Sequence, residues 1–217
     1  MNIELARFNM IEQQIRPWDV LDLGVLELLG IVKREDFVPA DYRTMAFVDT
    51  EVPLAGGQSM LAPKVEARLL QELAVRKHER VLEIGAGSGY MAALLAHKAQ
   101  HVTSIEIRPE LARLAADNLK HAGLANVSVI TADGAAGHAV DGPFDVILLS
   151  GSVAEVPQAL LAQLKVGGRL AAVVGQLPVM RAELVRRTEN HGLQTTILFD
   201  TVAPRLQGFV EPSRFRF

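Results

Sequence analysis

Short apolar runs alternate with longer amphipathic segments between residues 79 and 176 of the chain. The runs are rich in Val, Leu and Ile, and they predict buried parallel strands over residues 80–84, 101–106, 127–131, 144–149 and 168–174. The segments between them predict helices over residues 89–98, 109–122 and 156–164. Strands and helices that alternate in this way are typical of a doubly wound, mainly parallel α/β sheet.

The pattern changes after residue 180. Polar and apolar positions alternate over residues 181–189 and again over 193–202, and Glu189–Gly192 between them has the composition of a turn. This alternation predicts a C-terminal antiparallel hairpin. A helix over residues 179–188 is the alternative.

Residues 1–60 precede the alternating unit and show helical spacing instead. Apolar residues recur at this spacing within the first fifteen positions, and residues 20–30 form a second apolar stretch that starts after a proline. We therefore expect an N-terminal helical extension that packs on a domain of residues 61–217, as a lid or a packing layer, within one structural unit.

Composition limits the possible functions. The 217 residues carry a net charge of −3, which gives no general attraction to nucleic acid. No run approaches the roughly 18 apolar residues of a membrane span, and the N-terminus lacks the pattern of a signal peptide, so we expect a cytoplasmic protein. The absence of cysteine excludes thiolate chemistry. The six histidines lack metal-ligand spacing, which predicts surface histidines and no metal site.

A glycine-rich turn follows the first predicted strand. Val81–Ile84 leads into alternate glycines from Gly85 to Gly89, and residues 90–98 continue as a helix, so backbone N–H groups gather near a helix N-terminus. The spacing differs from the G-x-G-x-x-G loop of dinucleotide-binding folds, which disfavours an NAD-dependent oxidoreductase. Glu83 suits a cationic ligand group better than a pyrophosphate. Glu106, at the end of the next strand, can accept both ribose hydroxyls of an adenosine.

The pattern E-x-G-x-G-x-G resembles motif I of the class I S-adenosylmethionine (SAM) methyltransferases. In that family the acid of motif I, here Glu83, helps to hold the amino-acid end of SAM. The resemblance implies a Rossmann-like, seven-stranded class I methyltransferase fold, with SAM as cofactor and S-adenosyl-L-homocysteine as product. It implies cofactor contacts at Glu83, Gly85, Ala86, Gly87, Ser88, Gly89, Glu106, Ile107, Asp133 and Gly134.

A more specific resemblance covers about residues 5–175. Five segments follow, in order, the motifs of the protein-L-isoaspartate O-methyltransferase family: Arg7–Ile15, Val32–Pro39, Ala46–Asp49, Val52–Pro63 and Val81–Tyr90. That family methylates the free carboxylate of isoaspartyl residues, which starts the repair of damaged proteins. The resemblance implies an enzyme whose partners are isoaspartyl-containing proteins or peptides, and it leaves a monomer and a homodimer open.

One position departs from the family's acceptor motif, Q-T-I-S-x-P. The motif stands here as Gln58–Pro63, so Leu61 occupies the position of the serine that the family treats as catalytic. The family's C-terminal F-V-P-L segment is also altered, over Val202–Phe209. Ser59 is the candidate substitute for the missing hydroxyl, and we expect an acceptor pocket formed by Gln58, Ser59, Met60 and Leu61. The alternatives are an unknown small acceptor, or a SAM-binding protein without catalysis that acts through partners or as a sensor.

Overall fold

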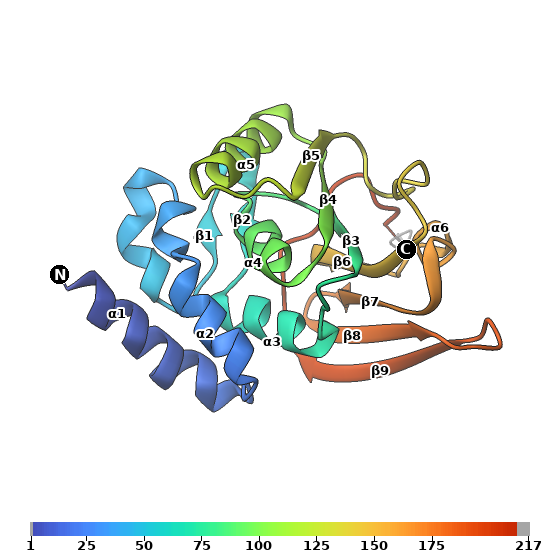
Figure 1. The fold of residues 1–217 in the computed structure, drawn as a ribbon, viewed down its shortest axis with the longest axis horizontal. Coiled ribbons are helices and arrows are strands. Elements are labelled where there is room, and N and C mark those ends of the chain that lie inside the picture. Colours follow the sequence, from blue (N-terminus) through green and yellow to red (C-terminus); the bar gives the residue numbers. More distant parts are fainter. Residues whose placement is uncertain (1, 212–217) are drawn as a thin grey trace, which may run out of the picture.

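A computed structural model describes residues 2–211 as a seven-stranded sheet with helices on both faces (Figure 1). The strands lie in the order β5-β4-β3-β6-β7-β8-β9; the first five are parallel and the last two antiparallel. Their bounds are Arg80–Ile84 (β3), His101–Glu106 (β4), Val127–Thr131 (β5), Phe144–Val153 (β6), Leu164–Gln176 (β7), Val179–Arg187 (β8) and Leu193–Asp200 (β9). The predicted doubly wound, mainly parallel sheet with a C-terminal hairpin is confirmed.

The order in which successive strands are added to the sheet reverses at β3. This strand pairs with β4 on one side and with β6 on the other, parallel to both. In open α/β sheets, ligands bind outside the carboxyl ends of the strands at such a switch point. Side chains alternate between the two faces along each strand, so Val81 and Leu82 belong to different hydrophobic clusters. The carboxyl ends of β3, β4 and β6 are therefore the place to look for a ligand site.

Four helices pack against the sheet: α3 (Pro63–Leu73), α4 (Tyr90–Lys98), α5 (Pro109–His121) and α6 (Gln158–Leu161). The sequence did not lead us to predict α3, although its apolar residues recur at helical spacing. The helix expected over 156–164 is confined to α6, because the chain already joins the sheet at Leu164, which pairs with Phe144 before a bulge. None of the helices within residues 2–211 is long and apolar enough to cross a membrane.

The N-terminal residues form the predicted helical layer. It contains α1 (Ile3–Asn9), which continues into a π-helical segment at Met10–Ile15, and α2 (Leu23–Ile31). Short 3-10 segments follow at Arg16–Trp18, Arg34–Asp36, Ala40–Phe47 and Ala55–Gly57, with a small antiparallel pair of β1 (Val52–Pro53) and β2 (Ser59–Met60). Figure 1 shows α1 and α2 at the left, beside α3 and α4.

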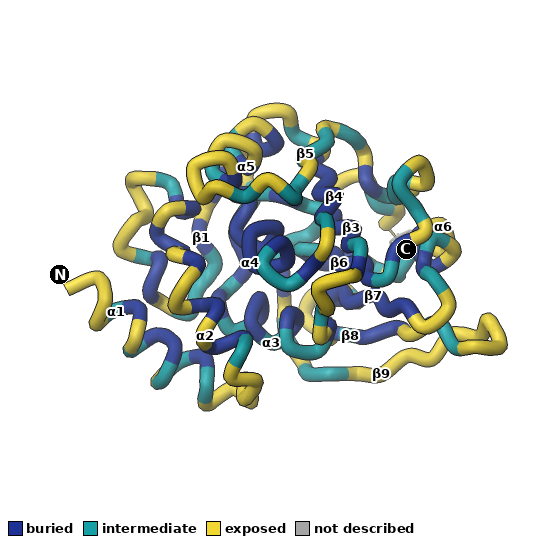
Figure 2. Tube along the Cα trace, in the orientation of Figure 1, coloured by how far each residue is buried: buried dark blue, intermediate teal, exposed yellow. Residues whose placement is uncertain are grey.

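The layer and the sheet share one hydrophobic cluster. Met10, Ile15 and Leu29 are buried in the same cluster as Leu70 of α3 and Leu94 of α4. Figure 2 shows this buried centre, and it shows the edge strand β9 as largely exposed. The division at residue 60 stays a prediction, because the core is continuous across it.

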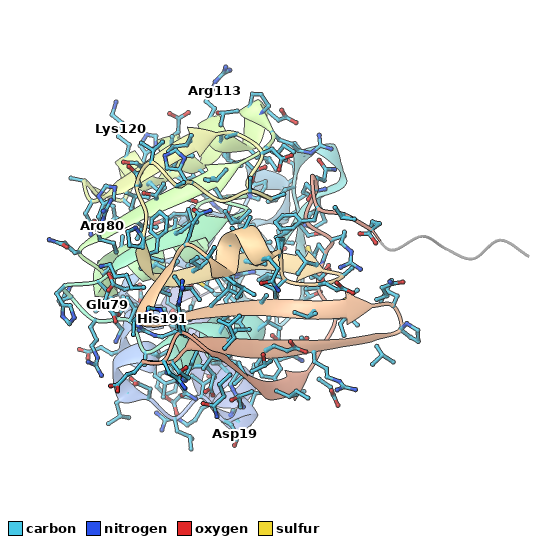
Figure 3. All side chains as sticks on the ribbon, turned by 90° about the vertical axis from the view of Figure 1, so that its right-hand side faces the viewer. Asp19, Glu79, Arg80, Arg113, Lys120 and His191 are labelled. Carbon is cyan, nitrogen blue, oxygen red and sulfur yellow. The ribbon has the colours of Figure 1, made fainter. Side chains whose placement is uncertain are left out.

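Charged side chains project from the outer surface. Arg113 and Lys120 project from α5 in Figure 3, and His191 lies in the turn between β8 and β9. None of the six histidines is buried.

Candidate active site

The glycine-rich turn between β3 and α4 has the backbone geometry that its sequence predicts. Gly85, Gly87 and Gly89 all have positive φ angles, of 95°, 53° and 85°, a region that side chains disfavour. A Cβ at Gly89 would also lie only 3.1 Å from the carbonyl oxygen of Ala115 in α5. The glycines therefore allow both the turn and its close contact with α5.

Glu106 holds this turn against the end of β4. One of its carboxylate oxygens, Oε2, accepts a hydrogen bond from the Gly87 N–H at 2.9 Å, and the other, Oε1, accepts one from the Arg108 N–H at 3.1 Å. A carboxylate has about four lone-pair positions, so both oxygens retain acceptor capacity. Glu106 lines the pocket described next, at the position expected for a group that binds hydroxyls.

A main pocket lies at the carboxyl ends of β3, β4 and β6. It holds about 470 Å³ of empty space, counted out to its open mouth. Several of the residues expected from the sequence line it: Gln58, Ser59, Gly85, Gly87, Glu106, Ile107 and Gly134. Leu54, which precedes the acceptor loop (Gln58–Pro63), and Leu206 of the C-terminal segment also line it.

The C-terminal segment closes one side of the main pocket. Pro204 accepts a hydrogen bond from the Ser152 N–H at 2.7 Å, and the Leu206 N–H donates to the Ser152 carbonyl at 2.9 Å. The Leu206 side chain then lies over Gly85, where an added Cβ would be 2.7 Å from its Cδ2. The altered C-terminal segment therefore forms part of the pocket wall.

Glu83 lies behind the pocket wall. Its carboxylate is fully buried and accepts hydrogen bonds from the hydroxyls of Ser104, at 2.6 Å, and Ser150, at 2.7 Å. Burial raises the pKa of Glu83 to about 7, against the opposing effect of the two serine hydroxyls. Glu83 lines neither the main pocket nor its neighbour, whereas Ser150 lines both.

A side pocket of about 270 Å³ adjoins the main pocket and shares with it Ser59, Gly85, Gly87 and Ser150. Its wall also contains five further residues of the expected site and its surroundings: Met60, Leu61, Ala86, Ser88 and Met91. Two residues that the sequence did not indicate complete the wall, namely Glu66 of α3 and Tyr90 of α4.

Leu61 is held by the N-terminal layer. Its side chain is buried, and its carbonyl accepts a hydrogen bond from Arg34 Nη2 at 2.9 Å. Arg34 also forms a buried ion pair with Glu66, and its guanidinium lies 5.2 Å from the centre of the Tyr90 ring. The acceptor loop thus rests on a buried arginine that comes from outside the sheet domain.

Besides Glu83, two other expected site residues, Asp133 and Gly89, line neither pocket. Asp133 Oδ1 accepts a hydrogen bond from the Ala135 N–H at 2.9 Å, and a Cβ added to Gly208 would lie 2.5 Å from it. Asp133 therefore contacts the C-terminal segment at the rim of the main pocket. Gly89 instead caps the N-terminus of α4.

The family model for protein-L-isoaspartate(D-aspartate) O-methyltransferase matches residues 7–202. The chain belongs to this family. It is 42% identical over 196 residues to the protein-L-isoaspartate O-methyltransferase of Koribacter versatilis, covering 90% of this chain and 88% of the relative. It is 39% identical over 191 residues to the protein of the same name from Methanoculleus marisnigri, covering 88% and 86%.

Solved structures with the same fold were also found. A candidate protein-L-isoaspartate O-methyltransferase from Plasmodium falciparum, crystallised with S-adenosyl-L-homocysteine, superposes with a TM-score of 0.81 at 20% identity, covering 95% of this chain and 99% of that one. A second structure, of a protein-L-isoaspartate O-methyltransferase, gives a TM-score of 0.77 at 24% identity, covering 93% and 66%. At these identities, the likeness shows the fold.

The buried Arg34–Glu66 pair was the main feature of the site that sequence reasoning missed. A signal was present, because Glu66 lies at helical spacing from the apolar residues Leu70 and Leu73 and so falls on the buried face of α3. Charged residues on such a face are almost never fully buried unless they are paired. The partner could not be found in this way, since Arg34 lies 32 residues earlier in the chain.

Proposed function

We propose that this protein transfers a methyl group from SAM to the free carboxylate of isoaspartyl residues in proteins or peptides. The observation that carries the proposal is the pair of connected pockets between the glycine turn and the acceptor loop, in a chain that belongs to the protein-L-isoaspartate O-methyltransferase family. Identity of about 40% over most of the chain to relatives named for this activity favours catalysis over a role limited to binding.

The main pocket has donors and acceptors that fit SAM. Glu106 has free acceptor capacity for ribose hydroxyls, and the glycine turn leaves a cradle that a Cβ would fill at Gly85 and Gly87. We assign the backbone of Gly85–Ser88 to the methionine part, and Ile107 and Gly134 to the walls around the adenine. Asp133 lies at the rim on the same side. The Plasmodium falciparum relative is named as a complex with S-adenosyl-L-homocysteine, which supports this choice of cofactor.

The acceptor loop is assigned to the isoaspartyl group. Ser59 lines both pockets, and we assign it to the acceptor carboxylate at the junction where the two pockets meet. Its hydroxyl can donate a hydrogen bond to the acceptor carboxylate, a role that the apolar Leu61 side chain cannot fill. Gln58 lines the main pocket beside it and supplies amide donors. Met60 and Leu61 exclude water from the other side.

Methyl transfer to a carboxylate requires the protein to position the acceptor rather than to transfer a proton. SAM supplies an electrophilic methyl group on a sulfonium. A carboxylate acceptor is already ionised near neutral pH, so no residue of this chain has to act as its general base. The protein instead has to hold the acceptor oxygen in line, at roughly 3 Å, in a site that excludes water. Leu54 and Leu206, two apolar residues of the pocket wall, are suited to exclude water.

A transfer assay with two isomeric peptides tests the proposed function. Tritiated SAM is incubated with a peptide that contains one isoaspartyl residue, and separately with the same peptide carrying an ordinary aspartyl residue. We expect label in the isoaspartyl peptide and far less in its isomer. An absence of transfer at high enzyme concentration, with S-adenosyl-L-homocysteine binding intact by calorimetry, would overturn the repair activity and leave the cofactor assignment standing. The cytoplasmic location stays a prediction from the sequence.

A further inference from the structure

Two buried carboxyl groups lie near the glycine turn, and they differ in their access to the pockets. Each oxygen of Glu83 accepts one hydrogen bond from a serine hydroxyl, Oε2 from Ser104 and Oε1 from Ser150. The Glu83 side chain reaches neither pocket. A cofactor group in the pockets would therefore meet Ser150 before it could meet Glu83.

Glu66, in contrast, forms part of the side pocket wall. Arg34 Nη1 donates to its Oε2 at 2.5 Å, and among residues 2–211 no other hydrogen bond to this carboxyl is present. Its second oxygen, Oε1, accepts no hydrogen bond from these residues, and Glu66 as a whole is 3% exposed. Buried carboxylates normally have all their acceptors satisfied. The side pocket therefore presents an acceptor that is ready for a donor.

The Tyr90 hydroxyl lies in the wall of the same pocket. Tyr90 is 2% exposed, and its hydroxyl has no hydrogen-bond partner within the described part of the chain. An unpartnered buried hydroxyl is unfavourable. Two polar groups from different helices, Glu66 of α3 with one oxygen free of hydrogen bonds and Tyr90 of α4, thus line one pocket. This combination indicates a ligand group that donates several hydrogen bonds.

We propose that Glu66 also binds the ammonium group of SAM, with the Tyr90 hydroxyl as a second acceptor. The proposal rests on the proposed function, because it assigns one end of the same cofactor. An ammonium carries three N–H donors and no acceptor, which matches the free groups of the side pocket. The shared wall of Ser59, Gly85, Gly87 and Ser150 makes the side pocket continuous with the main pocket, where the adenosine is assigned.

The charge balance of the pocket agrees with this assignment. Burial raises the pKa of Glu66 to about 7, while Arg34 opposes the shift and Asp49 adds to it. A cation bound beside Glu66 would favour its ionised form. Arg34 pairs with one oxygen of this carboxylate, so a bound ammonium would meet the other.

Calorimetric titration with two product-like ligands tests the proposal. S-adenosyl-L-homocysteine carries the amino-acid end, whereas 5′-methylthioadenosine has the same adenosine and thioether without it. We expect Glu66→Gln to weaken binding of the first ligand at least about tenfold, the effect of one charge-assisted hydrogen bond, and to leave binding of the second unchanged. Glu66→Asp withdraws the carboxylate from the pocket while keeping a charge for Arg34, and it should show the same selective loss if the glutamine variant does not fold.

Glu35→Gln is the matched control, because Glu35 is also a buried carboxyl paired with an arginine, Arg7, and lines neither pocket. Both ligands should bind this variant as they bind the wild type. An equal loss for both ligands in Glu66→Gln, no loss for either, or a selective loss confined to Glu83→Gln would overturn the proposal. Failure of the wild type to bind either ligand would instead contradict the proposed function itself.

Discussion

Glu83 is a carboxyl group held at the centre of the sheet, where ionisation is unfavourable. Its two serine hydrogen bonds favour the charged form, but burial outweighs them, and nearby Glu106 and Glu66 add to the effect. The protein thus carries two buried carboxyls, Glu66 and Glu83, whose pKa values lie near 7. This property has a direct consequence for the stability of the free protein.

The free energy of unfolding should fall as the pH rises from about 4.5 to 7. In this range, the two carboxyls ionise in the unfolded chain, where their pKa is 4.5, before they ionise in the folded protein. The unfolded state then binds fewer protons, so each group destabilises the fold by on the order of 3 kcal/mol once the pH exceeds 7. The melting temperature, measured between about pH 5 and 8, should decrease less in Glu83→Gln than in the wild type.

The comparison with Glu83→Gln also removes other titrations from the result. Burial lowers the pKa of His97, which makes stability rise with pH over part of the same range. This contribution is common to both proteins and cancels between them. Identical pH dependence in the variant and the wild type would contradict the account of Glu83.

Ser59 is the second residue whose role can be isolated. We expect Ser59→Ala to lower kcat/KM for an isoaspartyl peptide by about tenfold or more, because it removes a hydrogen bond to a charged acceptor. Leu61→Ser in the same background should restore part of the loss, since it returns a hydroxyl to the family's position. Steady-state kinetics with SAM at saturation checks both values. Full activity in Ser59→Ala would show that the acceptor is oriented by another group.

At the scale of residues, the sequence indicated the residues around the cofactor better than those around the acceptor. Gly85, Gly87 and Glu106 follow strand ends, so their convergence could be predicted from the order of the strands alone. The contact of Leu206 with Gly85 could not, because it depends on how the C-terminal segment pairs with Ser152. Long-range contacts of this kind leave no local pattern.

At the scale of elements, the regular strands were predicted well and the short helical segments poorly. β3, β4 and β5 have the bounds expected from their apolar runs. The helix before β7 was predicted too long, because the pairing of Leu164 with Phe144 draws residues that follow α6 into the sheet. Strand pairing here decided the conformation of residues whose local pattern was ambiguous.

The contact between the glycine turn and α5 predicts how substitutions of two glycines will differ in their effect on stability. Gly89 and Gly123 both have positive φ, but a Cβ at Gly123 would meet nothing within 4 Å, whereas one at Gly89 would touch the Ala115 backbone. Gly123→Ala should therefore lose about 1 kcal/mol of stability, from backbone strain alone. Gly89→Ala should lose clearly more and should also weaken S-adenosyl-L-homocysteine binding. Urea unfolding measures the difference, and equal losses would contradict a packing role for Gly89.

At the scale of the whole molecule, the N-terminal layer behaves as part of the core. Arg34 reaches from this layer to Glu66 in α3 and to the Leu61 carbonyl, and apolar residues of the layer lie in the same cluster as those of α3 and α4. Removing one partner of a buried ion pair typically costs about 3–5 kcal/mol. The layer should therefore unfold together with the sheet.

Trp18 allows this to be measured, because it is the single tryptophan of the chain and lies in the N-terminal layer. Its ring is 3.9 Å from Lys64 Nζ of α3, and its carbonyl accepts a hydrogen bond from Arg68. We expect the urea transition followed by Trp18 fluorescence to coincide with that followed by far-ultraviolet circular dichroism. A fluorescence transition at clearly lower urea would show that residues 1–60 form a separate unit.

The whole account depends on which atom receives the methyl group. The most direct measurement is tandem mass spectrometry of an isoaspartyl peptide after incubation with the protein and SAM, with fragmentation that locates the added methyl. The account predicts one methyl group, as an ester on the free α-carboxylate of the isoaspartyl residue, and an unmodified aspartyl isomer. A methyl group on any other side chain, or equal modification of both isomers, would contradict it.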